Sequence, residues 1–166
     1  MLKSYILQKD HLKSFLRQLS KNRSLVAPVK NRYGDTMFSK LESLDDAELD
    51  LANQAQASLK PFLFPQQQVL LEYEIEPESG RYSFETINSS EPTIFFGLRS
   101  CDLSSILYMD VTFLKDNKDP YYSQKRTENI LISIGCNDPF PNCFCQQTKS
   151  GPFMEYGFDL QLTDLG

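Results

Sequence analysis

Two short apolar runs separated by an amphipathic segment set the strongest limit on how this chain folds. Residues 93–98 (TIFFGL) and 129–134 (NILISI) have the composition of strands that are buried on both faces of a sheet. Between them, Leu103, Ile106 and Leu107 begin an apolar series at helical spacing. A strand, a helix and a second strand in this order predict a βαβ crossover, with the two strands paired in parallel.

The remaining patterns add elements around this crossover. An amphipathic helix is predicted over residues 8–20, and two short strands joined by a turn are predicted over residues 24–38. Residues 69–75 have the pattern of a strand or a short helix, and residues 78–90 contain a glycine-centred turn and an edge strand. A last strand is predicted over residues 158–164. The predicted fold class is α/β, with a short mixed, partly parallel sheet, the βαβ crossover and the N-terminal amphipathic helix.

The length of the chain limits how many domains it can form, and its charge limits which partners it can bind. A chain of 166 residues with 40% hydrophobic residues can bury one sizeable core. We expect an N-terminal α+β lobe (residues 1–90) and a βαβ lobe with the cysteines (residues 91–166), joined in one compact domain. A net charge of -5 without a lysine or arginine run argues against nucleic acid and membrane partners. Because neither a signal peptide nor an apolar run of membrane-spanning length is recognisable, we expect a cytoplasmic protein.

Four cysteines are the residues most indicative of function. In a reducing compartment we do not expect them to form disulfides. Cys101 follows the first buried strand and Cys136 closes the second, so parallel pairing places both at the carboxyl edge of the sheet, where open α/β sheets build their sites. Cys143 and Cys145 lie on an irregular loop (residues 137–157) that can fold back over this edge. We therefore predict that four thiolates surround one metal centre.

The residues alone leave other interpretations of these cysteines open. Cys101 and Cys136 can be inert buried thiols, or one cysteine can be a redox or catalytic thiol. A position at a helix N-terminus favours the anionic form of Cys101. The spacing C-x6-C-x-C from Cys136 matches neither the C-x2-C-x2-C run of ferredoxins nor a paired C-x2-C zinc site, so spacing does not distinguish iron from zinc.

The other candidate residues have structural explanations. His11 is the only histidine and is expected at the surface of the first helix, and Asp102 is expected to cap the crossover helix. Arg99 is expected either to tune a metal site or to form an ion pair, for example with Asp164. Residues 119–122 (DPYY) are expected to form a turn followed by core aromatics. No dinucleotide-binding or P-loop motif occurs in the sequence.

Residues from about 64 to 166 resemble a known family. The motifs that carry the resemblance occur in a fixed order: IFFGLRSCDLSSILYMDVTFL, DPYYSQKR, NILISIGCNDPFPNCFC, SGPF and GFDLQLTDLG. They are similar to the N-terminal part of the beta subunit of cytoplasmic sulfhydrogenases and to the related iron-sulfur subunit of anaerobic sulfite reductase. The resemblance implies an iron-sulfur protein that passes electrons between a partner that binds flavin and NAD(P)H and a hydrogenase or sulfite-reductase-type partner.

The resemblance also assigns ligands. It implies that Cys101, Cys136, Cys143 and Cys145 match the cysteine positions of the family and bind one 4Fe-4S cluster. The family shows Arg-Pro-Cys-Asp where this chain has Arg99-Ser100-Cys101-Asp102, a change that relaxes the backbone before the cysteine and keeps the ligand.

The resemblance has further consequences for the size of the protein and for its role. The family continues into a ferredoxin-like domain with two further clusters, so we expect this sequence to be truncated before that domain. We assign no catalytic residue here, and we expect the chain to be a component of an oxidoreductase complex that does not catalyse a reaction alone. The alternative is a structural zinc module that docks a partner without redox activity.

Overall fold

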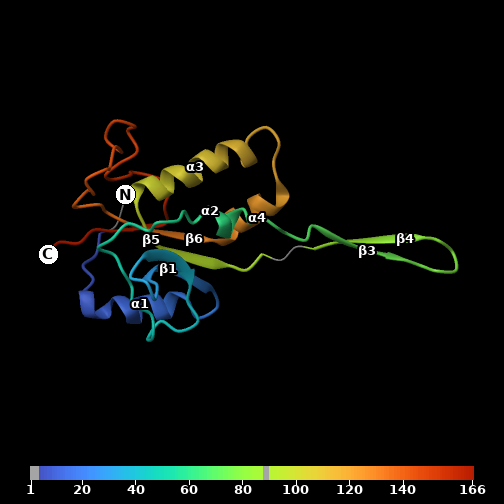
Figure 1. Ribbon diagram of the computed structural model, residues 1–166, viewed down its shortest axis with the longest axis horizontal. Helices are drawn as coiled ribbons and strands as arrows, with labels where there is room; N and C mark the ends of the chain where they lie inside the picture. Colours follow the sequence, from blue (N-terminus) through green and yellow to red (C-terminus); the bar gives the residue numbers. More distant parts are fainter. Residues whose placement is uncertain (1–3, 88–89) are drawn as a thin grey trace.

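The computed structural model describes residues 4–87 and 90–166, and a five-stranded sheet forms its centre (Figure 1). The strands lie in the order β2-β1-β5-β6-β7. β1, β5, β6 and β7 run parallel, and β2 pairs with β1 in the antiparallel sense. The strands are β1 (Ser24–Lys30), β2 (Thr36–Lys40), β5 (Thr93–Leu98), β6 (Ile130–Ile134) and β7 (Leu160–Leu162). The predicted α/β class and the mixed, mostly parallel sheet are confirmed.

Helices cover both faces of this sheet, which gives three layers. Figure 1 shows α1 on one face and α3 on the other, together with α2 and α4. The helical elements are the 3-10 helix η1 (Lys9–His11), α1 (Leu12–Leu19), α2 (Lys60–Leu63), α3 (Ser100–Leu114) and α4 (Pro120–Glu128). The predicted N-terminal amphipathic helix is confirmed. In the described part of the chain, none of these helices has the length and apolar character needed to span a membrane.

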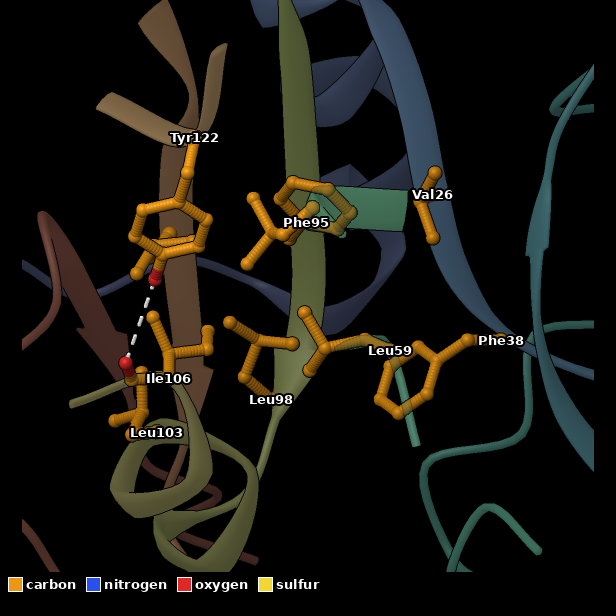
Figure 2. Close-up of a cluster of buried hydrophobic side chains, with 10 residues drawn as sticks. Val26, Phe38, Leu59, Phe95, Leu98, Leu103, Ile106 and Tyr122 are labelled. Carbon is orange, nitrogen blue, oxygen red and sulfur yellow. Dashed lines mark hydrogen bonds between the residues drawn. The ribbon is translucent and has the colours of Figure 1, made fainter. Parts of the chain in front are cut away.

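Each face of the sheet has its own apolar core. On the face of the sheet that α3 covers, side chains of α2, α3 and α4 pack on Phe95 and Leu98 of β5 (Figure 2). On the opposite face, Leu16 of α1 packs against Ile94 and Phe96 of the same strand. Because β5 supplies side chains to both cores, the whole of residues 94–98 is buried, as the continuous apolar run predicts.

The connection between β5 and β6 contains one helix more than the sequence patterns predict. Residues 119–122 were expected to form a turn, and the structure shows that they start α4 instead. The Asp119 carboxylate accepts a hydrogen bond from the Tyr122 backbone N–H at 2.7 Å, and Pro120 occupies the first turn, where no N–H is needed. Tyr122 is a core aromatic, as expected; its ring is buried and its hydroxyl contacts the Ile106 carbonyl (Figure 2).

Gly97 interrupts the regular pairing of β5 close to its carboxyl end. Its φ of +78° lies in the left-handed region, and the register between β5 and β6 shifts between Phe96 and Leu98. A Cβ atom at this position would lie 2.8 Å from Cδ of Pro28 on β1. Gly97 therefore allows β5 to approach the Pro28 ring of β1 closely, two residues before Arg99, which precedes α3.

A second, two-stranded sheet projects from the body of the molecule (Figure 1). It consists of β3 (Leu71–Ile75) and β4 (Tyr82–Thr86), paired antiparallel, and confirms the strand alternative for residues 69–75. We call residues 71–86 the arm. All ten residues of its two strands are exposed.

Candidate functional site

The carboxyl edge of β5 and β6 brings Cys101 and Cys136 to the same end of the sheet. β5 ends at Leu98 and α3 starts at Ser100, which makes Cys101 the second residue of that helix. β6 ends at Ile134, two residues before Cys136. Because β5 and β6 are parallel neighbours, both cysteines follow strand ends at one edge, where the sequence places them. Cys136 is buried, whereas Cys101 is exposed.

The loop of residues 137–157 returns over this edge. A Cβ atom at Gly151 would lie 3.2 Å from the Cys145 sulfur, and it would overlap the hydroxyl of Ser100 at the start of α3. Further along the loop, Phe153 packs directly on Gly135, which follows β6. The two glycines thus let the loop approach the edge closely, and the loop places Cys145 beside the start of α3.

The structure does not assemble the four sulfurs into a coordination sphere. All four cysteines are free; Cys143 is exposed and Cys145 is half-buried. In the ranges 4–87 and 90–166, no three histidine, cysteine, aspartate or glutamate side chains lie close enough together to hold a metal ion. Cys101 and Cys136 follow parallel strands at one edge of the sheet, and Cys145 lies on the loop that returns to this edge. That these three cysteines converge with Cys143 on a single metal centre stays a prediction.

Arg99 is the residue that contacts this edge most directly. Its side chain is buried, and Nη1 donates a hydrogen bond to the Cys136 sulfur at 3.3 Å. Nη2 donates to the backbone carbonyls of Leu51 (2.8 Å) and Asn53 (3.4 Å). The guanidinium also lies 5.0 Å from the ring centroid of Phe140, within the distance of a cation–π interaction. Arg99 therefore joins the turn at residues 51–53 to the cysteine edge.

In the described part of the chain, no carboxylate forms an ion pair with the Arg99 guanidinium. Asp164, the carboxylate that the sequence suggests as its partner, pairs instead with Lys9 at 2.8 Å. Asp102 instead accepts a hydrogen bond from the Arg99 backbone N–H at 3.0 Å, which confirms its capping role. The contacts of the guanidinium are thus with the Cys136 sulfur, with the carbonyls of Leu51 and Asn53, and with the Phe140 ring.

Desolvation dominates the acid–base behaviour at the start of α3. Although Cys101 is exposed as a residue, loss of water around its thiol, followed by the charge of Asp102, raises the pKa of Cys101 to about 11. The backbone N–H groups of the helix start and the charge of Arg99 lower the pKa of this thiol, as expected, but by less. Burial likewise raises the pKa of Asp102, against the opposing effects of Arg99. A protonated thiol is a weak nucleophile, which disfavours a catalytic role for Cys101.

The donor chemistry of the edge fits a thiolate-bound metal. Four free thiols occur at the edge itself and on the loop that covers it, and the buried guanidinium of Arg99 is directed at one of them. Thiolates bind zinc and the iron of iron-sulfur clusters, and hydrogen bonds to the sulfurs are a common feature of cluster sites. Cys101, Cys136, Cys143 and Cys145 are therefore the residues that would hold a metal group here.

The turn that supports Arg99 was missed in the sequence, and Asp50 organises it. The Asp50 carboxylate accepts hydrogen bonds from Thr36 Oγ1 (2.6 Å), from Asn53 Nδ2 (2.9 Å) and from the backbone N–H groups of Ala52 and Asn53. Aspartate followed by asparagine three residues later is a sequence signal for such a turn. This turn orients the two carbonyls that bind the guanidinium.

We expect Asp50→Asn to destabilise the protein by about 2 kcal/mol at pH 7, because two backbone donors and the Thr36 hydroxyl lose a charged acceptor. Burial raises the pKa of Asp50, but the hydrogen bonds from Thr36, Asn53 and Ala52 outweigh it and lower the pKa to about 2. This stabilisation is therefore complete above the unfolded pKa of about 3.9 and is lost as the pH falls toward 2.

Urea unfolding at pH 7 and at pH 3 measures this effect of Asp50. The difference between Asp50→Asn and the unmodified protein should shrink at pH 3. Asp46→Asn, a substitution of an exposed aspartate nearby, should change the free energy of unfolding little at either pH. An equal loss for Asp50→Asn at both pH values would contradict the assigned role.

Comparison with known proteins agrees with the resemblance that the motifs indicate. The chain is 26% identical over 161 residues, 96% of its length, to Sulfhydrogenase 2 subunit beta of Pyrococcus furiosus. It spans 45% of the length of that relative. No family model and no solved structure matches the chain. The aligned region includes the cysteine-bearing half and confirms the resemblance that the motifs indicate: this chain is similar, over nearly its whole length, to the sulfhydrogenase beta subunit family.

Proposed function

We propose that this chain is an electron-transfer module of a multi-subunit oxidoreductase, and that Cys101, Cys136, Cys143 and Cys145 bind one 4Fe-4S cluster. The similarity to a sulfhydrogenase beta subunit supports the complex, and the buried guanidinium of Arg99 on the Cys136 sulfur is the observation that supports the site most strongly. In the proposed role, electrons pass between a partner that binds flavin and NAD(P)H and a partner of the hydrogenase or sulfite-reductase type.

The residues around the site would have distinct roles. A bound 4Fe-4S cluster supplies one-electron transfer within the protein. Arg99 would hold the Cys136 sulfur by a hydrogen bond and partly balance negative charge at the edge. Asp102 fixes the start of α3, and with it the position of Cys101. Gly151 leaves the space in which the loop brings Cys145 to this helix start. Cys101 and Cys143 are exposed residues, so part of the proposed site would lie at the surface, where a partner can approach.

The test is anaerobic purification and reconstitution with iron and sulfide. We expect about four irons per chain, broad visible absorption that dithionite bleaches, and an EPR signal of the reduced protein. Replacing any one of the four cysteines by alanine should remove most of the iron and the EPR signal, because each thiolate is a ligand.

Phe144→Ala is the matched control for the cysteine variants. Phe144 lies between Cys143 and Cys145 and its side chain is largely exposed, so its removal should leave iron content unchanged. Colourless protein with one bound zinc, lost in the same four cysteine variants, would select the structural zinc module instead. Metal-free protein after reconstitution would contradict both proposals.

A further inference from the structure

The arm carries an unusually large apolar surface for a segment that contacts so little of its own chain. Five large apolar side chains of the arm are 49% to 69% exposed. They are Leu71, Tyr73, Ile75, Tyr82 and Phe84. Hydrogen bonds tie the base of the arm to the body: the Tyr121 hydroxyl donates to the Leu70 carbonyl at 2.7 Å, and Lys125 Nζ donates to Gln68 Oε1 at 2.8 Å. Figure 1 shows the arm extending away from the sheet and its helices.

The two faces of the arm differ in chemistry. The strand register pairs Tyr73 with Phe84 and Ile75 with Tyr82, so these aromatic and aliphatic residues share one face. Their rings interact: the centroids of Tyr73 and Phe84 are 6.5 Å apart, and Tyr82 stacks on Phe84 at 6.3 Å. Side chains alternate along a strand, so Glu72, which pairs with Glu85, and Glu74 occupy the opposite face.

We propose that the arm docks into a cleft of another protein chain, with one apolar wall against the aromatic face and one wall of lysine or arginine side chains against the glutamates. An isolated two-stranded hairpin is marginally stable in water, and contiguous exposed apolar surface marks interaction sites. Both faces of this hairpin are exposed, so a partner can contact the two at once. Charge complementarity requires the partner to be basic where it meets Glu72, Glu74 and Glu85.

The same charges argue against two other occupants. A second copy of this chain has the same net charge of -5. Its acidic arm would be repelled by the glutamate face of the first copy. An anionic membrane surface would be repelled in the same way. A basic cleft on a different chain avoids both repulsions, and the apolar face adds the hydrophobic contribution that a stable complex needs.

The arm and the cysteine edge lie at opposite ends of the long axis of the molecule. Figure 1 shows the arm at one end, and the loop of residues 137–157 with the start of α3 at the other. Docking through the arm therefore leaves the cysteine edge uncovered. The proposal shares with the proposed function only the existence of a partner chain, and the two can be tested separately.

Photocrosslinking of the full chain in cells of its native host tests the proposal. The photoreactive residue p-benzoylphenylalanine replaces Tyr73 on the arm, or Tyr33 at the β1–β2 turn, which is 73% exposed, as the control. We expect irradiation to join position 73, but not position 33, to a peptide of a different chain that contains apolar and basic residues. Mass spectrometry of the crosslinked peptide identifies that chemistry directly.

Charge reversal tests the basic wall. Glu72→Lys with Glu74→Lys should lower the crosslinking yield at position 73 by about tenfold, because like charges then face each other. Glu42→Lys with Asp46→Lys makes the same change in net charge at exposed positions away from the arm and should leave the yield unchanged.

Three results would overturn the proposal. They are crosslinks only to a second copy of this chain, crosslinks only to lipid, and a yield at position 73 no higher than at position 33. Iron content, measured on the same preparations, separates this inference from the proposed function. Iron-loaded protein without crosslinks would refute only the docking role of the arm. Crosslinked protein that takes up no iron would refute only the proposed cluster.

Discussion

Gly97→Ala is expected to lower the free energy of unfolding by about 2–5 kcal/mol, through a left-handed backbone and overpacking together. At φ +78° an alanine loses the preference that glycine has for this conformation. Its Cβ would also lie 2.8 Å from Cδ and 2.9 Å from Cγ of Pro28 on the neighbouring strand β1. Both strands are buried at this point, so the clash has no room to relax toward solvent. Urea unfolding followed by circular dichroism measures the change.

Gly34→Ala separates the two causes. Gly34 also has a positive φ, +88°, but a Cβ there would meet no atom within 4 Å. It should therefore lose only the backbone contribution, about 1–2 kcal/mol. If Gly97→Ala fails to fold, the double variant with Pro28→Ala should recover stability, because the clashing ring is removed. Equal losses for Gly97→Ala and Gly34→Ala would show that the contact with Pro28 is unimportant.

Arg99→Gln is expected to lower the reduction potential of the reconstituted protein by on the order of 50–100 mV. The reason is that Arg99 donates a hydrogen bond to the Cys136 sulfur and brings a positive charge, and both favour the more negative, reduced state. A hydrogen bond to a charged group contributes about 1.5–3 kcal/mol, and 59 mV of a one-electron couple corresponds to about 1.4 kcal/mol. An EPR-monitored redox titration measures the potential.

Arg99→Lys and Arg126→Gln are the controls for this prediction. Lysine keeps the charge but loses the planar group that also binds the Leu51 and Asn53 carbonyls. The reduction potential of Arg99→Lys should therefore lie between those of Arg99→Gln and the unmodified protein. Arg126 pairs with Asp110 at 3.1 Å, away from the cysteine edge, and its replacement should leave the potential unchanged. An unchanged potential in Arg99→Gln with full iron content would restrict Arg99 to a structural role.

Local sequence patterns were sufficient to predict the central strands of the sheet, because each pattern there has a single structural interpretation. The apolar runs at residues 93–98 and 129–134 are buried on both faces, and a strand in that environment cannot alternate polar and apolar residues. Residues 119–122 were wrongly expected to be a turn because Asp followed by Pro starts a turn or a helix equally well. Only the burial of Tyr122 against α3 selects the helix.

The candidate site was predictable in outline but not in its contacts. Strand order alone places Cys101 and Cys136 at one edge. The hydrogen bonds of Arg99 join it to Cys136 and to Leu51, residues that are 37 and 48 positions away in the sequence. Such pairs depend on how the turn after β2 packs against the sheet, and a single sequence contains no local signal for that. The docking surface on the arm was missed for a related reason, since the pattern of its strands does not show that both faces stay exposed.

The connection between β6 and β7 has a consequence for how the edge of the sheet is held. Parallel neighbours need a long crossover, which is usually a helix that supplies its own hydrogen bonds. Here the crossover is the cysteine loop, in which residues 137–157 form turns and bends but no helix. An open loop of this length gives up considerable chain entropy when its ends are fixed. A metal group bound by cysteines of the edge and of the loop would cross-link them and lower that entropic penalty. In this fold a metal group would therefore also stabilise the pairing of β7 with the sheet.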